Sequence, residues 1–214
     1  MNKIKPAGEC YGRWHYGEPD EKSPPSLPLS IAWSGWTDVA TALKESEQLS
    51  AGMSGDRYIA FGGGDVAGSF NPCCVDAVTR AIQSGILKDY GYDGVCYCLQ
   101  EGAAGLSDAL EASFSIARQN GFKVLVSCIP PFSFVDANKL MSSLLASDNI
   151  DIFSPQLYES WFEPYNTYSV VEGDYDFQHC NAKFVVDLTY PELYREAKQF
   201  FSDKGREPEG YILR

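Results

Sequence analysis

Residues 93–101, DGVCYCLQE, place two thiols and an amide at alternating positions of a short apolar run. Successive side chains of a β-strand point to opposite faces, so Cys96, Cys98 and Gln100 should share one face. A thiolate can act as a nucleophile or a metal ligand, whereas an amide is not acidic enough to serve as a general acid. Glu101 follows directly and should point to the other face. The stretch therefore predicts a strand whose shared face carries two thiols and an amide but no carboxylic acid.

The thiols of this chain do not suggest a metal centre. The seven cysteines show no repeated C-x-x-C spacing, and only His15 and His179 could supplement them as ligands. We expect reduced and mostly buried thiols, with Cys98 and Cys128 in contact across neighbouring strands. We expect no metal site and no cofactor.

Charge and hydropathy limit the partners that the chain could have. The formal net charge is −12, which argues against binding to nucleic acid or to an anionic membrane surface, since both attract Lys and Arg. No apolar run reaches about 18 residues, so no segment is expected to span a bilayer. The lysines near the N-terminus are not followed by an apolar stretch, so we expect no signal peptide. The chain should be cytoplasmic or the mature form of a processed protein.

Strand-like apolar runs alternate with helical stretches along most of the sequence. Helix signals include Thr37 or Asp38 as a cap, Pro72 in a first turn, and Asn120–Gly121 as a stop. The predicted strands cover residues 29–33, 57–64, 94–99, 123–130, 150–158, 183–189 and 209–213. The predicted helices cover residues 37–50, 71–91, 106–121, 136–149 and 191–205.

This alternation predicts an α/β protein with a parallel sheet. Residues 10–16 could supply a first strand, followed by the Pro-rich stretch 17–28 in place of a helix. We expect one domain over residues 1–214, with 1–28 as an irregular N-terminal segment. The strand count favours a small, somewhat abbreviated (β/α)8 barrel of the TIM type. The alternative is an open doubly wound sheet, although FGGGDVAG lacks the spacing of a dinucleotide-binding loop.

In a β/α barrel the functional residues lie at the C-terminal ends of the strands. The side chains expected there are rich in aromatic rings and amides and poor in basic groups, which suits the apolar faces and hydroxyls of a sugar better than it suits a phosphate. These residues are Trp33, Ser34, Trp36, Gly62, Gly63, Asp65, Gln100, Glu101, Pro130 to Phe132, Gln156, Tyr158, Glu159, Trp161 and Asp187.

The run DGVCYCLQ resembles the strand-four motif D-G-x-D-x-D-x-E of family-18 glycoside hydrolases, the chitinase family. Asp93 and Gly94 match, Cys96 and Cys98 stand in place of the inner aspartates, and Gln100 stands in place of the proton-donating glutamate. The resemblance covers roughly residues 29–213.

Two further segments match the family in part, and a third departs from it. YIAFGGG resembles the strand-three S-x-G-G pattern, with Gly62 and Gly63 kept and Ala60 in place of serine. SPQLYE resembles the strand-six ending Q-x-Y-[ND], with Gln156 and Tyr158 matching and Glu159 departing. The final GYILR lacks the tryptophan that the family usually places there as the floor of its sugar site.

The resemblance implies a barrel that has lost its catalytic acids, as in the inactive chitinase-like proteins. Without a glutamate at position 100, general acid catalysis worth about 10²- to 10⁴-fold is removed. We expect an inactive, lectin-like cleft that binds N-acetylglucosamine-type sugars through Trp33, Gly62, Gly63, Gln100, Gln156, Tyr158 and Trp161.

Two alternatives remain open at this point. The first is a structural, storage or assembly protein that uses the barrel surface without a ligand and self-associates through the aromatic loop of residues 161–180. The second is an active glycoside hydrolase in which a strand bulge moves Glu101 into the place of the missing acid.

Overall fold

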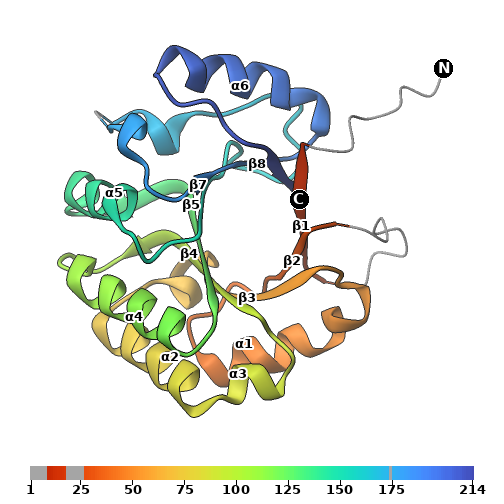
Figure 1. Cartoon of the computed structure of the whole chain (residues 1–214), viewed down its shortest axis with the longest axis vertical. Coiled ribbons are helices and arrows are strands. Elements are labelled where there is room, and N and C mark those ends of the chain that lie inside the picture. The colour runs from red at the N-terminus through yellow and green to blue at the C-terminus, as the bar shows by residue number, and fades with distance from the viewer. Residues whose placement is uncertain (1–8, 18–26, 174) are drawn as a thin grey trace.

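The computed structural model describes residues 9–17, 27–173 and 175–214, and these residues form an α/β protein with a nearly closed, barrel-shaped sheet, similar to a TIM barrel (Figure 1). All strand pairs are parallel, in the order β7-β6-β5-β4-β3-β2-β1-β9-β8. The strands are β1 (Cys10–His15), β2 (Leu29–Ala32), β3 (Asp56–Gly62), β4 (Gly94–Gly102), β5 (Lys123–Phe134), β6 (Ile152–Pro155), β7 (Lys183–Phe184), β8 (Val186–Leu188) and β9 (Tyr211–Leu213).

The barrel closes through the segment predicted as a single strand over residues 183–189. This segment forms two short strands, because it changes partner at Val185: β7 pairs with β6, and β8 pairs with β9. After this change of partner, an isolated parallel bridge between Asp187 and Gln156 still connects β8 to the residue that follows β6. The open doubly wound alternative is therefore wrong, because the two ends of the sheet meet.

The N-terminal strand completes the barrel. Residues 10–15 form β1, which pairs with β2 on one side and β9 on the other, as the prediction for residues 10–16 required. Most of the Pro-rich stretch 17–28 lies outside the described residues.

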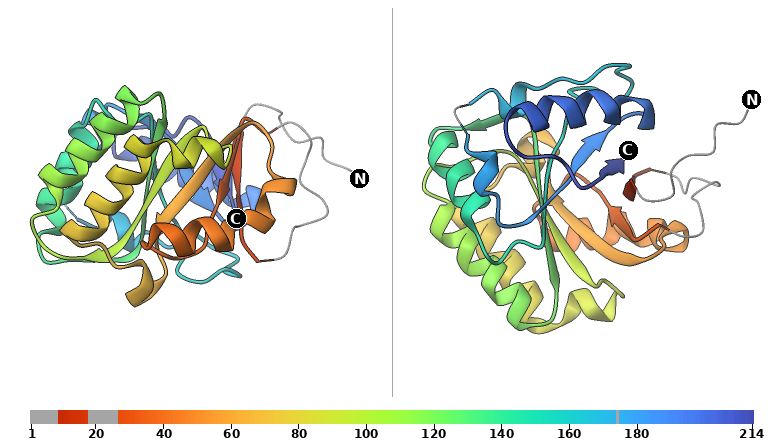
Figure 2. Two further views of the ribbon diagram at one scale, coloured as in Figure 1. Left: turned by 90° about the horizontal axis from the view of Figure 1, so that it is seen from below. Right: turned by 45° about the horizontal axis from the view of Figure 1, so that its top comes forward.

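Helices cover the outside of the sheet on most sides. They are α1 (Val39–Ser46), α2 (Pro72–Ser84), α3 (Ile86–Asp89), α4 (Ser107–Gln119), α5 (Ala137–Ala146) and α6 (Tyr194–Asp203). Figures 1 and 2 show α2, α4 and α5 side by side against the sheet, whereas α6 lies on the opposite side of the barrel.

The helix ends follow the sequence signals. The Asp38 carboxylate accepts a hydrogen bond from the Thr41 N–H at 2.9 Å and caps α1. Pro72 opens α2 behind the cap Asn71, and α4 ends at Gln119 before Asn120. These contacts satisfy backbone groups that a helix end otherwise leaves without partners.

Two apolar clusters hold the barrel together. The outer cluster lies between sheet and helices and includes Phe61, Tyr97, Phe114 and Phe153. The inner cluster fills the barrel and contains, among others, Trp14, Leu29, Ile31, Tyr58, Ala60, Cys96, Cys98, Leu125, Ile129, Ile152, Val185 and Ile212. The alternation of side chains along each strand separates the two clusters, as the sequence pattern predicts.

The expected contact between Cys98 and Cys128 is wrong for the same reason. Cys98 belongs to the inner cluster and Cys128 to the outer one, because Cys128 pairs in register with Leu99 rather than with Cys98. The thiol nearest to Cys98 is Cys96, with 3.7 Å between the two sulfur atoms, and all seven cysteines are free.

The Asp93–Gly94 pair has a structural role. The Asp93 carboxylate accepts a hydrogen bond from the Arg57 N–H at 2.9 Å, which ties the start of β4 to β3. A Cβ atom at Gly94 would lie 2.3 Å from the ring of Tyr58, a side chain that is fully buried inside the barrel. Only glycine leaves room for that ring.

We predict that Gly94→Ala destabilises the fold by about 1–3 kcal/mol, the usual cost of overpacking a tight core. Chemical denaturation monitored by tryptophan fluorescence measures the change. Gly52→Ala is the matched control, because its Cβ would meet His15 at an ordinary 3.7 Å. Equal stability of the two variants would contradict the packing role of Gly94.

Candidate functional site

A cavity of about 280 Å³ opens at the C-terminal ends of β1 to β6 and β9. This size is near the lower end of ordinary small-molecule sites, which are roughly 300–1,000 Å³. It is lined by Trp14, Tyr16, Trp33, Gly63, Gly64, Asp65, Gln100, Ile129, Pro130, Gln156, Tyr158, Glu159, Trp161 and Arg214.

Six of the seven residues predicted to bind a ligand line this cavity: Trp33, Gly63, Gln100, Gln156, Tyr158 and Trp161. The seventh, Gly62, accepts a hydrogen bond from the Trp33 indole N–H through its carbonyl at 3.2 Å. Gly62 and Gly63 both have positive φ angles, and a Cβ at Gly63 would lie 2.7 Å from Ile129. The glycine turn therefore keeps the cavity open and orients Trp33.

Aromatic rings form one wall of the cavity. Trp161 lies edge-on to Trp33, with ring centroids 5.4 Å apart, and beside Tyr16, with centroids 4.5 Å apart. The Arg214 guanidinium lies over the rings of Tyr16, Trp161 and Phe162, at 5.1, 4.7 and 4.7 Å from their centroids. Tyr16, which follows β1, and Arg214, which follows β9, thus both contact the loop that follows β6.

Two amides contribute polar groups to the cavity. Gln100 donates from Nε2 to the Pro130 carbonyl at 3.2 Å, and no described residue donates a hydrogen bond to its Oε1. Gln156 donates to the Tyr158 carbonyl at 3.0 Å. Gln100 Oε1 is therefore a buried acceptor without a donor among the described residues.

The thiols of Cys96 and Cys98 in β4 lie below the cavity and do not line it. Cys96 and Cys98 are fully buried in the inner cluster, so the shared face predicted for Cys96, Cys98 and Gln100 is the barrel interior. Burial raises the pKa of the Cys96 thiol well above its usual value, and the contact with Cys98 adds to this. The Cys96 thiol therefore stays neutral, which disfavours nucleophilic chemistry.

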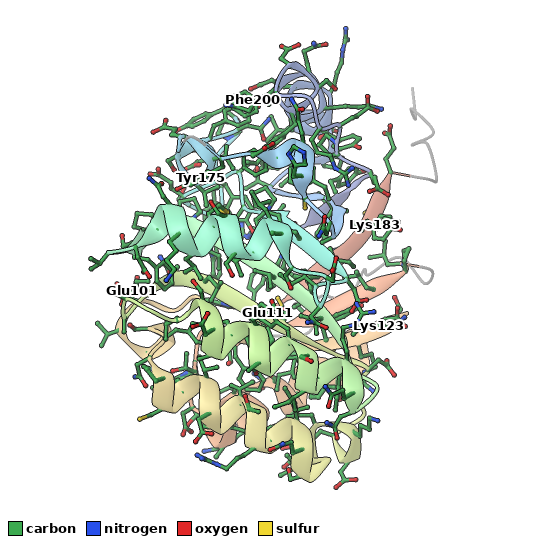
Figure 3. All side chains as sticks on the ribbon, turned by 60° about the vertical axis from the view of Figure 1, so that its left-hand side comes forward. Glu101, Glu111, Lys123, Tyr175, Lys183 and Phe200 are labelled. Atoms are coloured by element: carbon green, nitrogen blue, oxygen red, sulfur yellow. The ribbon has the colours of Figure 1, made fainter. Side chains whose placement is uncertain are left out.

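Glu101 does not line the cavity. A register shift in the pairing of β4 with β5 does occur between Leu99 and Glu101, as the displaced-acid alternative requires. Figure 3 shows Glu101 at the end of the barrel opposite to Lys123 and Lys183, which begin β5 and β7. Glu101 thus lies at the same end as the cavity, but the carboxylates that line the cavity are those of Asp65 and Glu159.

The carboxylates of the cavity are both exposed. Glu159 accepts a hydrogen bond from the Ser169 hydroxyl at 3.1 Å. Asp65 has a φ of 48° and is the one non-glycine residue with positive φ in the described ranges. A general acid that works near neutral pH usually needs burial, which neither side chain has.

Several lining residues were missing from the predicted set. Asp65, Pro130 and Glu159 were among the residues expected at the strand ends but were not predicted to bind a ligand. Their positions after β3, in β5 and after β6 could have identified them. Trp14 and Tyr16 follow from the alternation along β1. Arg214 follows β9 directly, at the place where the resemblance expects a tryptophan.

Asp187 lies below the cavity as a fully buried carboxylate. It accepts hydrogen bonds from the Ser127 and Ser154 hydroxyls at 2.8 and 2.7 Å. Burial raises the pKa of Asp187 to about 7, against the lowering effect of Ser154, Ser127 and Trp14. Burial also raises the pKa of Tyr158, with Asp187 as the second cause, so Tyr158 presents a neutral hydroxyl.

The comparisons with known proteins add no relative. No protein-family model matches this chain, and a search of curated proteins found no match. Among the described residues, no cluster of three or more His, Cys, Asp or Glu could hold a metal ion. None of their helices is long and apolar enough to cross a membrane.

We predict that Asp187 makes the fold more stable in acid. In the unfolded chain its carboxyl loses the proton near pH 4, whereas in the folded barrel it keeps the proton up to about pH 7. Its contribution is therefore complete below pH 4 and is lost as the pH rises to 7. The raised pKa corresponds to a change on the order of 4 kcal/mol.

The measurement is the free energy of unfolding of the wild type and of Asp187→Asn between pH 4 and 8. The variant should gain stability relative to the wild type across this range and level off above pH 7. Asp89→Asn, an exposed carboxylate, is the control and should track the wild type. A constant difference between wild type and Asp187→Asn would contradict the assignment.

Proposed function

We propose that this chain is a catalytically inactive, chitinase-like barrel that binds an amino-sugar saccharide in the cavity at its C-terminal face. The observation that carries the proposal is the convergence on one cavity of Trp33, Gln100, Gln156, Tyr158 and Trp161, which come from the ends of β2, β4 and β6. Aromatic faces, amides and a neutral hydroxyl suit the alternating apolar and hydroxyl surfaces of a sugar ring.

The chemistry of the cavity favours binding over cleavage. Gln100 occupies the place where the resemblance expects the proton donor, and its amide is held by the Pro130 carbonyl. Asp65 and Glu159 are exposed, and Glu101 does not line the cavity. A glycosidic oxygen would therefore meet hydrogen-bonding groups but no protonated acid.

The second candidate is an assembly role through the loop of residues 161–180. Its exposed aromatic residues are Trp161, Phe162 and Tyr165, with exposed fractions of 38%, 77% and 57%. The loop is less open than its composition suggests, because Phe177 is buried in the outer cluster and Tyr168 stacks on Phe200 at 3.8 Å. Trp161 also belongs to the cavity wall, which favours the binding role.

We predict that Trp161→Ala weakens sugar binding about 10- to 100-fold, because a large ring in a binding site usually contributes that much. Calorimetric titration with N-acetylglucosamine and short chitin oligomers measures the affinity. Tyr90→Ala, which removes an aromatic side chain of similar exposure from the opposite end of the barrel, is the control. Wild-type protein that gives neither heat nor a thermal shift at millimolar sugar would contradict the binding role and favour assembly.

We predict that the wild type releases no chromophore from a chromogenic chitobioside. The expected rate is that of the buffer, because no protonated acid lies in the cavity. Turnover that disappears in Glu101→Gln would establish the displaced-acid alternative. Turnover that disappears instead in Asp65→Asn or Glu159→Gln would assign the acid to the cavity rim.

A further inference from the structure

Arg214 is the one Arg or Lys side chain that lines the cavity among the described residues. Its guanidinium carbon lies 5.1, 4.7 and 4.7 Å from the ring centroids of Tyr16, Trp161 and Phe162, so cation–π attraction holds the charge beside the cavity. Contacts of this kind use the positive charge and do not use the N–H donors of the guanidinium.

Those N–H groups have no acceptor in the part of the chain that the structure describes. The Arg214 side chain makes no ion pair or hydrogen bond there, and its Nε atom is buried. A buried donor without an acceptor is costly, and this chain has 29 acidic residues from which a partner could have come. The cavity therefore offers a fixed cation whose partner does not come from the described part of the chain.

We propose that Arg214 binds the carboxylate of an acidic sugar, so that the ligand of this cavity is a pyranose that carries a carboxylate group. This inference rests on the proposed sugar-binding function and names the class of sugar. A guanidinium can present two parallel N–H groups, which match the two oxygens of a carboxylate.

The remaining groups of the cavity fit the rest of such a ligand. Gln100 brings an amide to the cavity, and Trp33 and Trp161 offer apolar surface to the ring. The cavity volume of about 280 Å³ fits a site for a single sugar ring. Asp65 and Glu159 do not oppose an anion strongly, because both are exposed and water and salt screen their charge.

The test compares sugars that differ by a carboxylate. One pair is D-glucose and D-glucuronate, and the other is N-acetylglucosamine and N-acetylmuramate. Titration calorimetry of the wild type at pH 7.5 and low salt should show the acidic member of at least one pair binding ten times more tightly or better. Sodium acetate, a carboxylate without a sugar, should bind much more weakly.

Variants then assign the preference to one side chain. Arg214→Gln should abolish the preference for the acidic sugar, so that the two members of a pair bind equally, and Arg214→Lys should retain part of the preference. Arg80→Gln, an exposed arginine on α2 that pairs with Asp76, is the control. Circular dichroism confirms that each variant is folded.

The outcomes distinguish failure of the role of Arg214 from failure of the sugar-binding function. Equal binding of acidic and neutral sugars, or a preference that survives in Arg214→Gln, would overturn the role of Arg214 and leave the sugar site intact. Acetate binding as tight as glucuronate binding would overturn the sugar part of the ligand assignment. No binding of any sugar would overturn the proposed function itself.

Discussion

Closure of the parallel sheet is the constraint on which the rest of this structure depends. The chain changes partner at Val185, from β6 to β9, and this single change joins the two edges of the sheet. Because closure brings the C-terminal ends of distant strands around one opening, Arg214 meets Trp161, and Asp187 is enclosed beside the serines of β5 and β6. An open sheet of the same strands would leave these groups on separate edges.

The polar groups inside the barrel are uncharged or hydrogen-bonded, because an unpaired charge is costly in a low-dielectric environment. Cys96 and Cys98 pack as small, apolar groups where charged side chains would need compensation. Asp187 is the exception, and its two serine donors and its raised pKa show how the fold accommodates a buried acid. Polar groups able to contact a ligand are confined to the layer above, where Gln100 and Tyr158 line the cavity.

Much of this organisation could be predicted from the sequence, because it depends on local patterns. Period-two alternation separated the inner from the outer face of β4, and caps such as Asp38 and Asn71 fixed helix starts. The split of the strand at residues 183–189 could not be predicted, because it reflects pairing with distant strands rather than local propensity.

The candidate site was predictable to the extent that strand ends define it. Trp33, Gln156 and Tyr158 follow directly from their positions after apolar runs. The missed lining residues Tyr16 and Arg214 directly follow the first and last strands, whose place in the barrel depends on closure. The position of Cys128 on the outer face was also missed, because it depends on the register of β5 against β4.

A crystal structure after a long soak with a chitin trisaccharide tests most directly whether the cavity holds a saccharide without cutting it. The expected result is an intact sugar chain with one ring against the aromatic wall formed by Trp33 and Trp161 and within hydrogen-bond distance of Gln100. Electron density for shortened products, or an empty cavity at saturating sugar, would contradict it.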